Sequence, residues 1–127
     1  MKTEHKPINF EDNRGLIRDI ISGEEYDALT FITCTPGALR GNHYHKESIQ
    51  LLYVISGKLI CAAKKENSDI ETIEINDGDL VTNEAGERHA FKAITNSVVL
   101  CITKGPRKGK NYEADTYRLK DEEKILL

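Results

Sequence analysis

The sequence predicts an all-β protein, a sandwich or barrel of short strands, and three observations lead to this fold class. Short β-rich runs recur along the chain, turn-forming residues separate them, and no central stretch keeps a helical apolar period. The turns are expected at Ser56-Gly57 and at residues 66–69, 76–78 and 95–97. The strands are expected at residues 15–20, 27–35, 40–45, 49–55, 58–63, 70–75, 79–83, 89–93 and 98–103.

The expected strands differ in how they fit a sheet. Residues 70–75, Ile-Glu-Thr-Ile-Glu-Ile, mix apolar and charged positions, as a strand covered on one face does. Cys34, Cys61 and Cys101 each lie in an apolar strand, and no two are spaced as a CxxC pair, so we interpret them as small hydrophobic residues in a reducing compartment. Residues 121–124, Asp-Glu-Glu-Lys, have the composition of a short C-terminal helix.

Length and charge limit the classes of function. A chain of 127 residues fits one domain, residues 1–127, which can bury a core without disulfides. A formal net charge of −3 argues against a nucleic-acid-binding protein, which needs a basic face. No apolar run resembles a signal peptide or is long enough to span a bilayer, so we expect a cytoplasmic protein without a membrane partner.

Three of the four histidines form the strongest functional signal. His43 and His45 are two apart on an expected strand and therefore project to the same face. His89 follows after further hairpins. A lone histidine on a strand usually has a structural role, but two on one face with a third in reach favour a functional site.

The segments around these histidines resemble the paired motifs of the cupin superfamily. In the first motif, Gly37, His43, His45 and Gly57 are in register, and Gln50 stands where a glutamate is usual. The second motif matches at Gly78, Gly86 and His89, whereas Glu84 replaces a proline and Ala93 an asparagine. The resemblance implies a cupin jelly-roll β-barrel (a double-stranded β-helix) with these histidines on its inner wall.

The same resemblance implies a metal site as one alternative. The ligands would be His43, His45, Gln50 and His89, and the ion would be Fe, Mn, Ni, Cu or Zn. Gln50 offers a carbonyl oxygen but no charge, so it holds a dication less tightly than glutamate does.

A narrower resemblance points to the sugar-nucleotide 3,4-ketoisomerases. It rests on the string Arg-Gly-Asn-His-Tyr-His-Lys at residues 40–46, followed by Gln50. Asp-Asn-Arg-Gly at residues 12–15 resembles an opening shared with the related 3,5-epimerases, and residues 112–118 loosely resemble a closing Tyr/Asp/Tyr/Arg stretch of the ketoisomerases. These enzymes act on thymidine-diphosphate-linked 4-keto-6-deoxy sugars. Tyr44, between the two histidines, departs from the small residue of that family.

The resemblance assigns roles to individual residues. His43 and His45 are the catalytic acid/base candidates, and the substrate-binding candidates are Arg14, Arg40, Lys46, Gln50 and His89. A histidine can carry a proton between adjacent carbons of the sugar through an enediol, and this reaction requires no cofactor. The basic run at residues 104–110 is interpreted as a solvated loop.

Three functions stay open on the sequence. The first is a sugar-nucleotide isomerase or epimerase, and the second is a metal-dependent cupin enzyme of the dioxygenase or lyase type. The third is a cupin that only binds a small ligand. A homodimer is expected in each case, because the edges of jelly-roll sheets must be covered.

Overall fold

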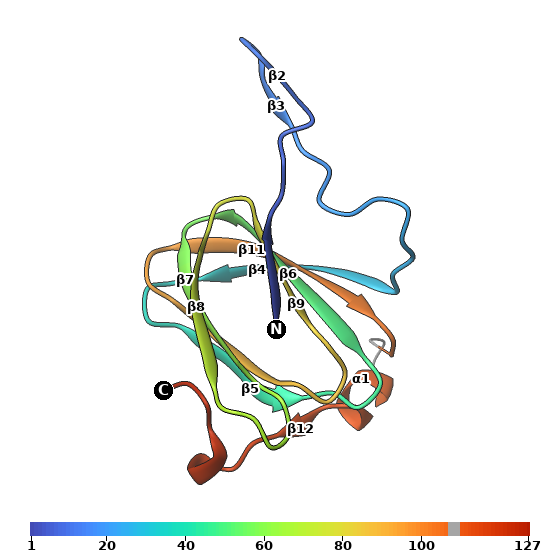
Figure 1. Ribbon diagram of the computed structural model, residues 1–127, viewed down its shortest axis with the longest axis vertical. Coiled ribbons are helices and arrows are strands. Elements are labelled where there is room, and N and C mark those ends of the chain that lie inside the picture. The colour runs from blue at the N-terminus through green and yellow to red at the C-terminus, as the bar shows by residue number, and fades with distance from the viewer. Residues whose placement is uncertain (107–109) are drawn as a thin grey trace.

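The computed structural model describes residues 1–106 and 110–127 and consists mainly of two five-stranded antiparallel sheets (Figure 1). The first sheet has the order β1 (Lys2–His5), β9 (Asp79–Asn83), β6 (Ile49–Ser56), β11 (Ser97–Lys104), β4 (Ala28–Cys34). The second has the order β12 (Tyr117–Arg118), β5 (Leu39–Tyr44), β10 (Arg88–Ala93), β7 (Lys58–Lys64), β8 (Glu71–Asn76). A hairpin of β2 (Phe10–Asp12) and β3 (Gly15–Ile17) stands clear of both sheets in Figure 1. The predicted all-β jelly-roll architecture is confirmed.

Each expected strand has a counterpart, and the differences have physical causes. The strand expected at residues 15–20 ends at Ile17, where the hairpin ends. The sequence did not predict β1, which is exposed and largely charged and is extended because it pairs with the edge of β9. It also missed β2, β12 and the helix α1 (Lys110–Ala114). The short C-terminal helix is a single 3₁₀ turn, Asp121–Glu123.

The barrel interior changes from apolar at one end to polar at the other along the same strands. On β6 the residues that point inward are Val54 and Leu52 in the apolar core and then Gln50. On β10 the series runs from Ala93 through Phe91 to His89. Because side chains alternate along a strand, the polar end faces the same interior as the core. The core itself consists of Cys34, Leu52, Val54, Leu59, Cys61, Ile75, Val81, Ala93 and Val99.

Segments outside the barrel cover the outer faces of both sheets. Ile20 and Ile21, which follow the hairpin, pack on a second apolar cluster over the first sheet. The C-terminal Ile125 packs on Ala62 and Ala90 of the second sheet. In Figure 1 the chain after β11 runs beneath β5, so the C-terminal segment lies against the strand that carries His43.

The cysteines lie in strands, as the sequence interpretation expected. Cys34 and Cys61 are buried, and burial raises the pKa of the Cys61 thiol to about 12, which keeps it protonated. Within residues 1–106 and 110–127, no helix has the length and apolar character needed to cross a membrane. Of the basic run at 104–110, residues 107–109 lie outside the described residues.

Candidate active site

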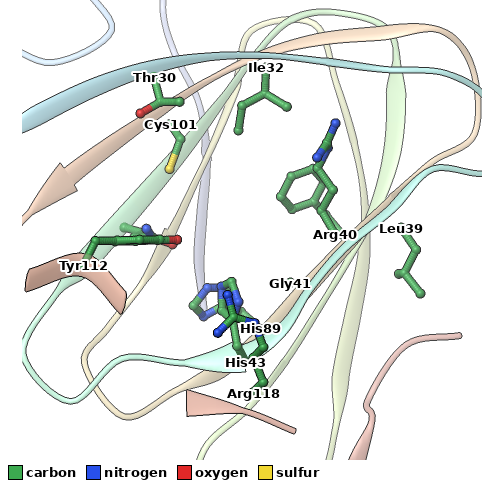
Figure 2. Close-up of a pocket in the computed structure, with 12 residues that line it drawn as sticks. Thr30, Ile32, Leu39, Arg40, Gly41, His43, His89, Cys101, Tyr112 and Arg118 are labelled. Atoms are coloured by element: carbon green, nitrogen blue, oxygen red, sulfur yellow. The ribbon is translucent and has the colours of Figure 1, made fainter. Parts of the chain in front are cut away.

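A cavity of about 370 Å³ opens at the polar end of the barrel (Figure 2). Its apolar floor is made by Ile32, Phe91 and Cys101, which also pack against the core. Strands of both sheets and the C-terminal segment supply its walls. The lining residues are Thr30, Ile32, Leu39, Arg40, Gly41, His43, Gln50, His89, Phe91, Cys101, Tyr112 and Arg118.

Three imidazoles meet on one wall of this cavity. The ring of His43 lies 4.8 Å from the rings of both His45 and His89, measured between centroids. One nitrogen from each ring can be chosen so that the three atoms lie within 4.8 Å of one another. His43 lines the cavity, whereas His45 is 1% exposed and lies behind it. The sequence predicted that the three histidines lie together. The structure adds that His43 and His89 line the cavity, whereas His45 lies behind them.

Backbone carbonyls fix the orientation of the two buried rings. Nδ1 of His45 lies 2.9 Å from the carbonyl oxygen of Asp115, and Nδ1 of His89 lies 3.0 Å from that of Glu87. A carbonyl only accepts, so each Nδ1 must carry the proton and donate it. In a neutral ring the lone pair is then on Nε2, and both Nε2 atoms are buried and without a hydrogen-bond partner among the described residues.

His43 and His89 are neutral at ordinary pH. Burial, together with the neighbouring His89 and His45 and with Arg118, lowers the pKa of His43 to about 3. Burial also lowers the pKa of His89 to about 4, although its hydrogen bond to Glu87 opposes the shift. Three imidazoles in one buried site cannot all become charged, so the cavity offers lone pairs.

Asp115 fixes the loop that follows His45. Its carboxylate accepts hydrogen bonds from the backbone N–H groups of Lys46, Glu47 and Ser48 at 2.9–3.2 Å. Burial raises the pKa of this carboxyl, but the N–H donors outweigh burial and the net shift is downward. One residue of the C-terminal segment thus holds both the ring of His45 and the backbone beside it.

The other substrate-binding candidates from the sequence divide into two groups. Gln50 and Arg40 line the cavity with His43 and His89. Arg40 reaches toward β4, where it donates to the Thr33 carbonyl oxygen at 3.2 Å.

Arg14 and Lys46 are not among the residues that line the cavity. Arg14 lies on the projecting hairpin, with its side chain 81% exposed and paired with Asp12. The Lys46 ammonium lies 4.5 Å from the ring centroid of Tyr117, in a cation–π contact. Tyr117 also stacks on Tyr44, which faces away from the histidines as the alternation of the strand predicts.

Sequence reasoning did not assign roles to Tyr112, Arg118, Thr30 and Cys101, which the structure brings to the cavity. Tyr112 comes from α1, and its ring centroid lies 5.5 Å from that of His45 (Figure 2). Arg118 is opposite His43 in the β12–β5 pair and forms an ion pair with Glu113. For Tyr112 and Arg118, the signal in the sequence was the resemblance of residues 112–118 to the closing stretch of the ketoisomerases.

Known proteins with a similar structure share one area of chemistry. A family model described as polysaccharide biosynthesis C-terminal domain matches residues 10–117. A 3,4-ketoisomerase from Helicobacter canadensis is similar with a TM-score of 0.80 and 19% identity, over 96% of this chain and 92% of that one. A dTDP-4-dehydrorhamnose 3,5-epimerase from Sulfolobus tokodaii has a TM-score of 0.79 and 18% identity, over 93% and 76% of the two chains.

A third solved structure belongs to a larger protein. The capsular polysaccharide assembling protein CapF from Staphylococcus aureus is similar with a TM-score of 0.63 and 25% identity. The match covers 91% of this chain and 32% of that one. No curated protein matches the chain. The structural neighbours confirm the cupin fold and the resemblance to ketoisomerases and epimerases that the motifs predicted.

Proposed function

Because the chain belongs to the polysaccharide biosynthesis C-terminal domain family, we propose that it is a cytoplasmic isomerase or epimerase of a nucleotide-linked 4-keto-6-deoxy sugar. The observation that carries the proposal is the cluster of His43, His45 and His89 at a cavity in a cupin barrel. The similar 3,4-ketoisomerase and 3,5-epimerase support the choice of substrate class.

In this proposal His43 is the base that meets the sugar, because it lines the cavity. His45 lies directly behind it, with Nδ1 held by the Asp115 carbonyl and Nε2 without a partner among the described residues, and is the second acid/base group. Gln50 and His89 orient the substrate from the adjacent wall. The low pKa of His43 makes it a weak base in the free protein, so the acidity of the sugar C–H must provide part of the driving force.

The proposed ketoisomerase reaction needs only proton transfers. The base takes the proton from C3, next to the 4-keto group, and the C–H electrons form a C3=C4 double bond while O4 gains a proton. The resulting enediol loses the proton on O3, C3=O forms, and C4 gains a proton. Atoms and charge balance without an oxidant, and cationic or neutral donors such as Arg118 or Tyr112 stabilise the developing oxyanion.

Deuterium exchange tests this function. In deuterated water the protein should place deuterium on carbons next to the keto group of a nucleotide-linked 4-keto-6-deoxy sugar. The assay reports proton abstraction even when the natural sugar is another isomer. Absence of exchange across several nucleotide sugars would contradict the proposal and favour a metal enzyme or a cupin that only binds its ligand.

A metal-dependent enzyme is the second candidate, and the orphaned nitrogens favour it. A divalent cation fits the donor set, since the buried Nε2 atoms of His45 and His89 have no partner among the described residues and neutral imidazoles are good ligands. His43, His45 and His89 would hold the ion, with Gln50 as an oxygen donor. Such an ion would polarise a bound keto group. Metal analysis of the purified protein separates the two candidates.

A homodimer is part of the proposal. The hairpin exposes Phe10, Leu16 and Ile17, and an isolated two-stranded hairpin is marginally stable in water. The edge strand β4 exposes Leu29 and Phe31. Contact with a second protomer would cover such apolar surfaces and would bring Arg14 near another chain.

A further inference from the structure

The strand that carries His43 contains one extra residue, Asn42. Arg40 pairs with Phe91 and His43 pairs with His89, and the register shifts between these two pairs. From one pair to the other, β10 advances by two residues and β5 by three. Asn42 is therefore the additional residue of a β-bulge.

The bulge determines which side chains of β5 face the cavity. In Figure 2, Arg40 and His43 both lie on the cavity side, although they are three positions apart on the strand. A regular strand alternates its faces, so without the extra residue Asn42 would stand opposite His89. His43 would then be opposite Arg88, whose guanidinium packs on Tyr44 on the other side of the sheet.

The backbone at the bulge is strained for ordinary residues. Gly41 and Asn42 have φ values of 92° and 56°. A Cβ atom on Gly41 would lie 2.8 Å from the carbonyl oxygen of His89, too close for any other residue. Asparagine tolerates the left-handed conformation better than most residues. Both residues of the bulge are therefore suited to it.

The C-terminal segment binds the bulge through the Asn42 side chain. Oδ1 accepts hydrogen bonds from the backbone N–H of Ile125 at 3.0 Å and of Leu126 at 3.3 Å, and Nδ2 donates to the Leu126 carbonyl at 2.9 Å. The Asn42 carbonyl accepts from the Leu119 N–H at 2.9 Å. Asn42 is 6% exposed and does not line the cavity.

We infer that Asn42 is a positioning residue: its contacts with Ile125 and Leu126 maintain the bulge that turns His43 toward His89 and the cavity. The inference deepens the proposed function and rests on it only for the role of His43 in catalysis. The C-terminal segment thereby becomes part of the architecture of the site.

Three substitutions separate the contributions of the bulge. Asn42→Gly keeps the left-handed backbone and loses the side-chain contacts, Asn42→Asp keeps the acceptor for Ile125 and Leu126, and Asn42→Ala loses both the conformation and the contacts. Asn67→Gly is the control, because Asn67 also has a left-handed φ, of 60°, but is exposed in the turn between β7 and β8 and does not line the cavity. If Asn42→Ala does not fold, Asn42→Gly and Asn42→Asp still test the role of Asn42.

Two measurements report on the position of the His43 ring. The first is the nuclear Overhauser effect between the ring protons of His43 and His89, whose centroids are 4.8 Å apart. The second is kcat and KM on a nucleotide-linked 4-keto-6-deoxy sugar. In Asn42→Gly the ring contact should weaken and kcat should fall by about a hundredfold for a displacement of about 1 Å, with a smaller change in KM.

The controls should behave differently. Asn42→Asp should retain most of both signals, and Asn67→Gly should leave both at wild-type values. The inference is overturned if Asn42→Gly retains the wild-type ring contact and kcat, or if Asn67→Gly loses them equally. If wild type turns over no sugar, the proposed function fails while the ring contact still tests the role of Asn42.

Discussion

Nδ1 of His45 lies 2.9 Å from the backbone carbonyl oxygen of Asp115, although 70 residues separate the two in sequence. The carboxylate of the same Asp115 accepts from three backbone N–H groups that follow His45. One residue thus sets the tautomer of the imidazole and the path of its loop. Because a carbonyl provides the contact to His45, the tautomer depends on the position of the C-terminal segment and not on the charge of Asp115.

The carboxylate itself should matter for stability. Asn at position 115 offers one acceptor oxygen in place of two and turns an NH₂ group toward backbone donors. Asp115→Asn should therefore reduce the free energy of unfolding by about 1–3 kcal/mol. Urea denaturation measures the change, and Asp121→Asn, with its side chain 94% exposed, is the control that should change little. Equal stability of the two variants would contradict a structural role for the Asp115 carboxylate.

The histidines of the cluster should differ from His5 in their effect on activity. His43→Asn should slow deuterium exchange into a 4-keto sugar by about a hundredfold or more, the usual contribution of a positioned base. His45→Asn should slow exchange as well. His5→Asn is the control, because the His5 side chain is 62% exposed and bonds Asp79 outside the cavity. Exchange that survives both cluster substitutions would mean that neither residue is the base.

Gln50→Glu should separate the acid/base site from the metal site. In a metal site the added charge should tighten binding of a dication, because carboxylate is the stronger ligand. In a site without metal the carboxylate should raise the pKa of the nearby imidazoles and slow proton abstraction, since more of each ring is protonated. Calorimetric titration of Zn²⁺ or Mn²⁺ into both proteins gives the answer. Equal affinity in the two proteins would remove the metal interpretation.

Stability should fall when the metal-free protein is acidified. The pKa values of His43 and His89 are about 3 and about 4 in the fold, and an unfolded histidine has a pKa of about 6.5. Between these values the unfolded chain binds more protons, so the free energy of unfolding decreases as the pH falls from about 6.5 toward 4. The decrease is about 1.4 kcal/mol per pH unit for each histidine that titrates in this way.

Denaturant unfolding at a series of pH values, after treatment with a chelator, measures this dependence. His43→Asn should make the free energy of unfolding depend less steeply on pH, because one titrating group is lost. A wild-type stability that is constant between pH 6.5 and 4 would show that the imidazoles are not shielded as the structure implies.

The exposed apolar residues should hold two protomers together. Phe31, 64% exposed on the edge strand β4, should lie in the interface, so Phe31→Asp should convert a dimer to a monomer. Ile70, 49% exposed beside β8, provides a control of similar character, and Ile70→Asp should remain dimeric. Sedimentation velocity at micromolar concentration distinguishes the two states. A wild-type monomer under these conditions would contradict the expected assembly.

Local sequence patterns predicted the strands of the barrel and the proximity of the histidines. Alternation and turn residues are local properties, so they identify β4 to β11 within a few residues. The spacing of His43, His45 and His89 matched a known pair of motifs, and the structure brings the three rings together. These features do not depend on distant parts of the chain for their recognition.

The contacts that complete the site come from segments that are distant in sequence. The contacts of Asn42 with Ile125 and of His45 with Asp115 join residues about 70 or more positions apart, which no local pattern specifies. The sequence also did not predict that Arg14 lies on a projecting hairpin or that Lys46 contacts the ring of Tyr117. Both residues have side chains of the type that binds substrates, wherever they lie in the fold. The chemical type of each side chain is known from the sequence, but the direction in which a side chain points depends on bulges and on packing between distant segments.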